Sequence, residues 1–211
     1  MWEAIVYYGT LTLEAFVGVF GIRLYEEAPY EVLARPTKRV EVRRYGSRVA
    51  VQIRLPSDDE LGRNEAFQIL FAYIAGANRL ARSCDDRGKI TGLLQLRCSE
   101  RVAMTVPVKI LQGDAEAYMQ FFLPIKYTIA TAPRPLDKRL SLVERTAEMT
   151  ASLRFGGVGH DVVARQAELI DSLKCSGWRP VGRPYILFYD APFTLPFLRR
   201  TEVAVSVFET R

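Results

Sequence analysis

Histidine is nearly absent from this chain of 211 residues, since His160 is the only one. A zinc site built on several histidines is therefore excluded, and a Ser-His-Asp or Cys-His catalytic site would have to use His160 itself. Cysteine is also scarce, with Cys84, Cys98 and Cys175 alone. This odd set contains no CxxC pair and no disulfide framework, so we expect a reducing, cytoplasmic setting.

Nucleotide-binding motifs are missing as well. The sequence contains no GxGxxG, no Walker A loop and no regular alternation of strands and helices. Lysine and arginine outnumber aspartate and glutamate by 29 to 24, but they occur as short pairs such as Arg43-Arg44 rather than as long runs. We therefore predict no nucleic-acid partner. Because no nucleophile–base pair or metal-ligand cluster is visible, we predict a binding protein and not an enzyme.

The N-terminal 27 residues are rich in apolar side chains, but Glu3 and Glu14 interrupt them. A transmembrane helix needs about 20 nearly uncharged residues, and the basic start of a signal peptide is missing, because the first arginine is Arg23. We predict an amphipathic helix and linker over residues 1–27. Such a helix would pack on the domain, on a second subunit in a homo-oligomer, or on a membrane surface.

The remainder, residues 28–211, is predicted to be a single α+β domain made of two pseudo-repeats, about 28–124 and 136–211. Each repeat reads strand, strand, helix, strand, strand. The strands before the first helix flank an expected turn at Gly46-Ser47, and the helices are expected over residues 64–75, capped by Asn64, and 161–174. Two such repeats can combine into one curved antiparallel sheet or open barrel, covered by the two helices.

Several motifs follow one another in a characteristic order: AMTVPV at residues 103–108, RFGG at 154–157, and YDAPFTLPFLRRTEV at 189–203. In this order and spacing they resemble the SOUL haem-binding protein family over about residues 28–211. The resemblance implies a distorted antiparallel β-barrel of two pseudo-repeats flanked by two helices. It also implies a tetrapyrrole ligand, haem or free porphyrin, held reversibly in an apolar cleft by a carrier or buffer.

A tetrapyrrole binder needs an apolar slot, cations for the propionates and sometimes an axial ligand. The resemblance directs the ligand to the first helix and the closing strands. The candidates are Arg63, Phe67, Leu70, Phe71 and Ile74 on the helix, with Met104, Lys109, Arg199 and Arg200 elsewhere. Each has a structural alternative, because a helical stripe commonly faces the core and the arginines have Glu202 nearby. His160 lies beside a glycine turn, which argues against an axial role, so no metal ligand is assigned.

Two other functions stay open. The duplicated plan also resembles bacterial effector-binding domains that take up drug-like cations, which predicts an acidic residue inside the pocket, with Glu31 or Glu144 as candidates. A third hypothesis is an interaction scaffold whose N-terminal helix docks a partner or a membrane.

Overall fold

The structure is a computed structural model of the chain. It describes residues 25–57, 59–80, 99–113, 116–156, 162–190 and 194–210. The predicted N-terminal helix falls almost entirely outside these ranges, as do His160, Cys84 and Cys98. Within the described ranges, no helix is both long and apolar enough to cross a membrane.

Nine strands form one antiparallel sheet, in the order β10-β4-β8-β7-β12-β13-β11-β3-β2. Their bounds are β2 (Tyr30–Thr37), β3 (Val40–Tyr45), β4 (Arg48–Arg54), β7 (Val108–Gln112), β8 (Ala117–Phe122), β10 (Leu140–Arg145), β11 (Glu148–Gly156), β12 (Trp178–Phe188) and β13 (Arg200–Glu209). Two short ladders join β1 (Glu26–Glu27) to β6 (Thr105–Val106) and β5 (Asn78–Arg79) to β9 (Arg134–Pro135).

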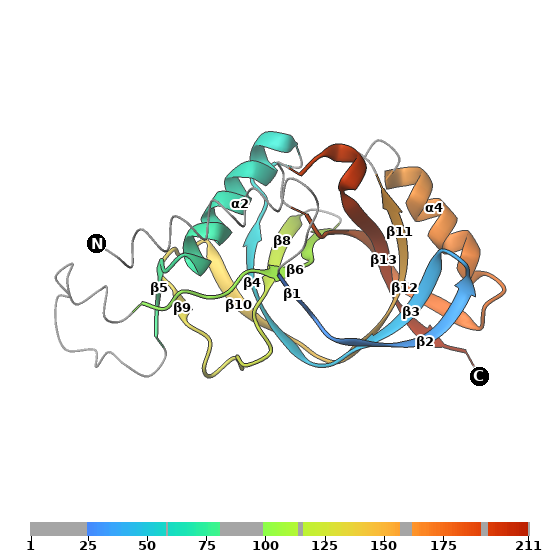
Figure 1. The fold of residues 1–211 in the computed structure, drawn as a ribbon, viewed down its shortest axis with the longest axis horizontal. Helices are drawn as coiled ribbons and strands as arrows, with labels where there is room; N and C mark the ends of the chain where they lie inside the picture. Colours follow the sequence, from blue (N-terminus) through green and yellow to red (C-terminus); the bar gives the residue numbers. More distant parts are fainter. Residues whose placement is uncertain are drawn as a thin grey trace.

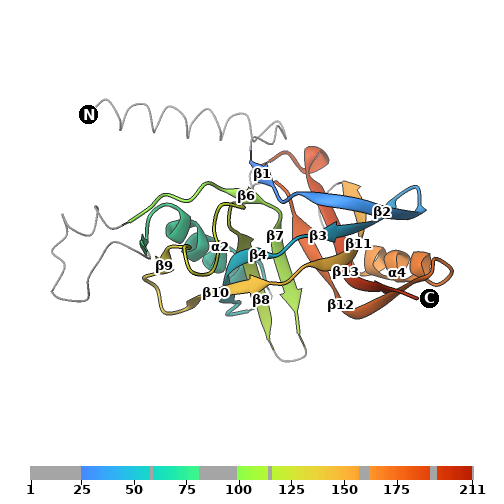
Figure 2. The ribbon, with the colours of Figure 1, turned by 90° about the horizontal axis from the view of Figure 1, so that it is seen from below.

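The helices are α2 (Glu60–Ile74) and α4 (Val162–Leu173), with a 3-10 turn η1 (Pro196–Leu198) before β13. Together with the sheet they confirm the α+β class. The sheet bends into an arch with α2 and α4 on its outer side (Figure 1), and the helices lie at opposite ends of the molecule (Figure 2).

The described residues form one open, curved sheet, which agrees with the predicted curved antiparallel sheet, and they do not close into a barrel. The two edges of the sheet are β10 and β2, at opposite ends of the strand order. The ladder between β2 and β3 shifts register twice, and β2 contains Pro36, which has no N–H to donate. Such an irregular edge is a poor template for another strand.

The first helix starts four residues earlier than the sequence predicts. Asp59, not Asn64, is the N-cap, and its carboxylate accepts a hydrogen bond of 2.8 Å from the Gly62 N–H. A Cβ on Gly62 would approach the Ser57 carbonyl to 2.4 Å, so the turn needs glycine there. The predicted C-terminal end is confirmed, because Gly76 follows α2 with φ of +120°.

The two halves exchange strands. The sequence predicts that β3 and β4 form one pair around a turn at Gly46-Ser47, and that β10 and β11 form another. Instead β4 pairs with β10 and β3 pairs with β11. The two ladders share one register, because Ile53 lies opposite Leu140 and Val40 lies opposite Leu153. The residues at 46–47 are therefore a bend at which the chain passes from one half to the other, not a hairpin turn.

The period-2 alternation of the strands separates two faces of the sheet. On the outer face, Val49, Val51 and Ile53 pack against α2 in one core, and Leu153, Val203 and Val205 pack with α4 in a second core. On the inner face the alternate residues of the same strands are largely polar, yet many are buried. Burial of polar groups without partners is costly, so the partners of these side chains define the site.

Candidate functional site

The centre of the inner face is the carboxylate of Glu202 on β13, which is fully buried. Arg43 on β3 donates to it twice, at 2.7 and 3.3 Å, and Arg200 donates twice more, at 2.9 and 2.7 Å. The hydroxyls of Ser152 and Tyr189 complete the shell at 2.6 and 3.0 Å. All the acceptor capacity of this carboxylate is therefore used within the protein.

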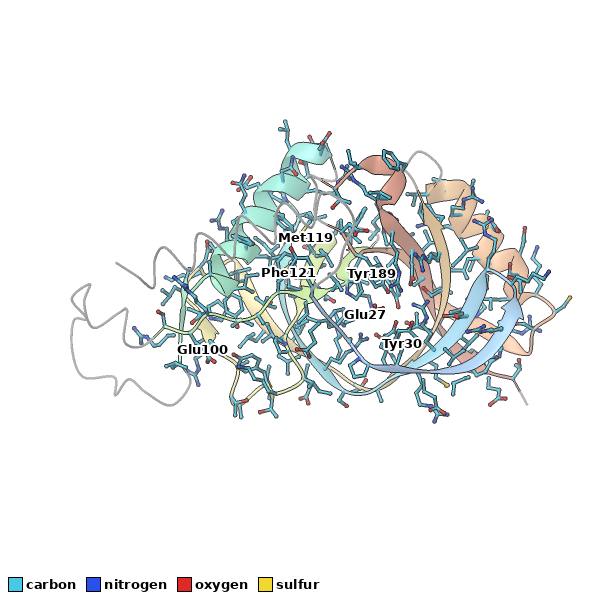
Figure 3. All side chains as sticks on the ribbon, in the orientation of Figure 1. Glu27, Tyr30, Glu100, Met119, Phe121 and Tyr189 are labelled. Atoms are coloured by element: carbon cyan, nitrogen blue, oxygen red, sulfur yellow. The ribbon has the colours of Figure 1, made fainter. Side chains whose placement is uncertain are left out.

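Two further carboxylates and two rings surround these arginines. Arg43 lies 2.9 Å from Glu41, and Arg200 lies 3.2 Å from Glu27 on β1. The guanidinium of Arg43 also lies 4.5 Å from the Tyr30 ring centroid, and that of Arg200 lies 3.7 Å from the Tyr189 ring centroid. Figure 3 shows Glu27, Tyr30 and Tyr189 between the two arms of the arch, where β1 crosses its hollow.

The electrostatics of this cluster favour the ionised pair. Burial alone would raise the pKa of the Glu202 carboxyl, but the two arginines and their hydrogen bonds outweigh it and hold the pKa below its ordinary value. Burial, with Glu202 beside it, raises the pKa of the Tyr189 hydroxyl. Tyr189 therefore remains a protonated hydrogen-bond donor at neutral pH.

A second cluster lies on the same face in the other half. Arg48 on β4 donates to the Glu148 carboxylate at 2.6 Å, and the ammonium of Lys109 on β7 lies 3.7 Å from the same carboxylate. The guanidinium of Arg48 sits 4.2 Å from the ring centroids of both Tyr45 and Phe122. These aromatic contacts hold the guanidinium in a fixed orientation.

Within this second cluster, Lys109 has a clearly shifted pKa. Its side chain is 5% exposed, and its ammonium lies 3.8 Å from the Tyr185 ring centroid. Burial, together with the neighbouring charges of Arg48 and Arg145, lowers the pKa of Lys109 to about 8, even though Glu148 opposes the shift. Titratable groups shifted in this way are commoner at functional sites than elsewhere.

A small pocket lies against this cluster, lined among others by Glu26, Ser47, Arg48 and Phe122. Its volume is about 50 Å³, whereas sites that enclose small molecules measure roughly 300–1,000 Å³. The pocket accommodates a chemical group and not a whole cofactor.

The predicted site residues on α2 lie on the opposite face of the sheet. Leu70 and Ile74 are buried in the core between α2 and the sheet, which is the structural alternative for a helical stripe. Phe67 is half-buried and Phe71 is 44% exposed. Figure 3 shows Met119 and Phe121, members of this core, on the α2 side. A ligand contact through these residues stays a prediction.

The other predicted residues are dispersed. Met104 is half-buried against the α2 core. Arg63 lies in the first turn of α2, where its N–H donates to the Asp59 carbonyl at 3.1 Å. Arg199 donates to the Thr194 carbonyl at 2.8 Å, whereas Arg200 binds Glu202, as its structural alternative anticipates. The nine candidates therefore do not converge on one cavity.

The effector-binding hypothesis predicts an acidic side chain inside a pocket, and the sequence offers Glu31 and Glu144 for this role. Glu31 and Glu144 are exposed, so the prediction that one of them supplies it is wrong. Glu202 occupies the inner face instead, but Arg43 and Arg200 already neutralise it. The signal that could have found this network is the pair of charged residues at alternate positions of β3, Glu41 and Arg43, interleaved with the apolar Val40 and Val42.

Solved structures share this architecture. The C-terminal domain of EcmrR aligns with a TM-score of 0.58 and 9% identity, covering 86% of this chain and 99% of that one. A protein described as a hydrolase from Listeria innocua aligns with a TM-score of 0.54 and 13% identity, covering 82% and 94%. At such identities the likeness concerns the fold alone. A comparison with curated proteins finds no match.

The family comparison covers most of the domain. The model of the family described as SOUL heme-binding protein matches residues 25–206. This range contains both halves of the exchanged sheet, both helices and the network around Glu202. The match also agrees with the motif order in the sequence. The chain belongs to the SOUL heme-binding protein family.

Proposed function

We propose that this protein is a reversible carrier or buffer of a tetrapyrrole, haem or free porphyrin, which it binds on the exposed side of α2. The observation that carries the proposal is an aromatic pair on that side. The rings of Phe67 and Phe71 are stacked, with centroids 6.3 Å apart and planes 15° apart. Arg63 precedes them on the same stripe, because residues 63, 67 and 71 are spaced by four.

This stripe suits the chemistry of a tetrapyrrole. Phe71 is 44% exposed, so a flat apolar disc gains contact area by covering it. Phe67 is held from behind, since its ring meets the Phe121 ring edge-on with centroids 5.4 Å apart. The Arg63 guanidinium supplies a donor for a propionate. Met104 packs against the same core.

An open surface suits reversible binding better than a closed cavity does. The pocket beside Arg48 is too small for a macrocycle. The described residues contain no group of three or more His, Cys, Asp or Glu side chains that could hold a metal ion. We propose that the macrocycle contributes most of the affinity, because the exposed Phe71 ring offers it apolar contact, so haem and free porphyrin should bind comparably.

The test is a titration of the purified full-length chain with haem and, separately, with protoporphyrin, followed by Soret absorbance and porphyrin fluorescence. We expect one-to-one saturation at micromolar concentrations, weakened at least about fivefold by Phe71→Ala. Phe208→Ala is the matched control, because Phe208 is a similarly exposed phenylalanine, 47%, on β13. Absence of saturation with either ligand would refute the proposal, and equal weakening by both variants would refute the α2 site.

The role of His160 is tested in the same titration. We expect His160→Ala to leave the Soret maximum of the haem complex unchanged. A displaced maximum would instead assign this histidine to the iron.

The cationic-effector alternative has weaker support. It requires an acidic group available to a ligand, and Glu202 is enclosed by two arginines. The scaffold alternative is tested by deleting residues 1–22, which under that hypothesis abolishes association while leaving the titration unchanged.

A further inference from the structure

Two arginines lie directly opposite each other on the inner face. In the ladder between β4 and β10, Arg48 is the cross-strand partner of Arg145. Strand alternation sends Leu140 and Leu142 to the α2 core or its edge, so Arg145 projects to the other face, as Arg48 does. Like charges in directly opposite positions are destabilising. A protein that keeps such a pair half-buried needs something to offset the repulsion.

The protein supplies only part of that compensation. The Nε atoms of both Arg48 and Arg145 are buried without a hydrogen-bond partner among the described residues. Lys109 adds a third positive charge that acts on the same region. The single carboxylate that contacts this group is Glu148, which accepts from Arg48 at 2.6 Å and lies 3.7 Å from Lys109. The neighbouring carboxylate, Glu202, is already paired with Arg43 and Arg200. Arg48 and Lys109 thus share one carboxylate, and Arg145 lies opposite Arg48 on the neighbouring strand.

We propose that Arg48 and Arg145, with Lys109, form a binding site for a small oxyanion, the carboxylate or phosphate group of a small molecule. A guanidinium presents its Nε–H and one terminal N–H as a planar fork that matches two oxygens of such a group. Arg48 is already oriented by the rings of Tyr45 and Phe122. Its terminal nitrogen serves Glu148, which leaves the Nε–H for an exogenous acceptor.

Arg48 lines the small pocket described above, and Arg145 lies opposite Arg48 on the neighbouring strand without being part of that lining. The pocket volume of about 50 Å³ fits a carboxylate or a similar group. Glu26 also lines the pocket, but its carboxylate accepts a hydrogen bond of 3.2 Å from the Ile125 N–H. The site lies on the opposite face of the sheet from the Phe67–Phe71 pair. It is therefore independent of the proposed tetrapyrrole surface and does not rest on it.

The experiment follows the arginine Nε–Hε signals of the ¹⁵N-labelled full-length chain by NMR. Sodium acetate and inorganic phosphate are titrated in separate arms, with chloride adjusted to keep ionic strength constant. We expect the signals of Arg48 and Arg145 to shift together and saturate in at least one arm, and the arm that saturates identifies the class of oxyanion. Shifts that stay linear, or that spread evenly over the arginines, would show screening only and overturn the site.

Variants assign the binding to this pair. Arg145→Gln should weaken the saturating anion at least about tenfold, whereas Arg44→Gln, which removes an exposed arginine of β3 paired with Glu31, should leave it unchanged. Arg145→Lys keeps the charge but loses the Nε donor, so we expect an intermediate affinity. If Arg145→Gln does not fold by circular dichroism, Arg145→Lys decides the matter. Affinity equal to that of the parent chain in the folded variant would overturn the proposal.

Discussion

Arg43 and Glu202 are 159 positions apart in the chain, yet the guanidinium of one donates two hydrogen bonds to the fully buried carboxylate of the other. Strand β11 lies between their strands, and its Ser152 donates to the same carboxylate. The pair therefore ties three neighbouring strands together on the inner face. A buried ion pair is not by itself a source of stability. Its disruption is nevertheless costly, because the remaining charge is then buried without a partner.

Replacement of Glu202 by glutamine should destabilise the fold strongly. The amide keeps the shape of the side chain but leaves Arg43 and Arg200 buried beside a neutral group. We expect the free energy of unfolding to fall by about 3–5 kcal/mol, measured by chemical denaturation. Glu209→Gln, on an exposed part of the same strand, should change it by less than about 0.5 kcal/mol. A loss below about 1 kcal/mol in Glu202→Gln would contradict the role given to this carboxylate.

Lys109 should make stability depend on pH. Burial lowers its pKa to about 8 in the native state, and the unfolded chain has the ordinary pKa near 10.5. Between these values the unfolded state binds more protons, so the contribution of Lys109 to the free energy of unfolding rises with pH. Below pH 8 the native state carries the full penalty of a buried ammonium.

The variant Lys109→Met removes that penalty. We expect it to be more stable than the parent chain by about 1–2 kcal/mol at pH 7, with a smaller difference at pH 9.5. Denaturant midpoints at the two pH values measure both differences. Lys38→Met, at an exposed position, should give a small difference that does not change with pH. A Lys109→Met advantage that grows with pH would contradict the sign derived above.

Adjacent residues of α2 should separate stability from ligand binding. Leu70 is 0% exposed in the α2 core, so Leu70→Ala should cost about 2–5 kcal/mol. Phe71 is substantially exposed, and Phe71→Ala should cost about 1 kcal/mol or less while weakening tetrapyrrole. Thermal unfolding without ligand, compared with the titration, measures both effects. Equal destabilisation by the two substitutions would show that Phe71 belongs to the core.

Arg145→Gln should stabilise the protein in the absence of anions. The substitution relieves the cross-strand repulsion with Arg48, which corresponds to a gain of about 0.5 kcal/mol. It should also remove the extra stabilisation that a saturating oxyanion gives the parent chain through linkage. Unfolding in chloride and in the anion that saturates provides the measurement. Arg44→Gln should show neither effect.

The sequence predicts much of the fold because its signals are local. Alternation marks β3, β4 and β11, and the stripe Leu70, Ile74 identifies the buried side of α2. The first residue of α2 is harder to predict, because both Asp59 and Asn64 are chemically suitable N-caps. In the structure Asp59 is the N-cap, and Gly62 packs closely against Ser57. Strand pairing is not local at all. A two-residue Gly46-Ser47 segment fits a hairpin and a bend equally well, and only contacts with residues 100 positions away decide between them.

The site was harder to predict for the same reason. Arg200 has Glu202 two positions away, so their pairing follows from proximity in the strand. The involvement of Arg43 and Ser152 depends on which strands become neighbours. The opposition of Arg48 and Arg145 likewise exists only because β4 pairs with β10 across the repeat boundary.

The pairing of β3 and β4 with β11 and β10 also constrains how this protein folds. Strands from the N-terminal part of the domain, β3 and β4, pair with strands from its C-terminal part, β11 and β10. Residues about 100 positions apart must meet before either core is closed, which favours slow, concerted folding over stepwise addition of halves.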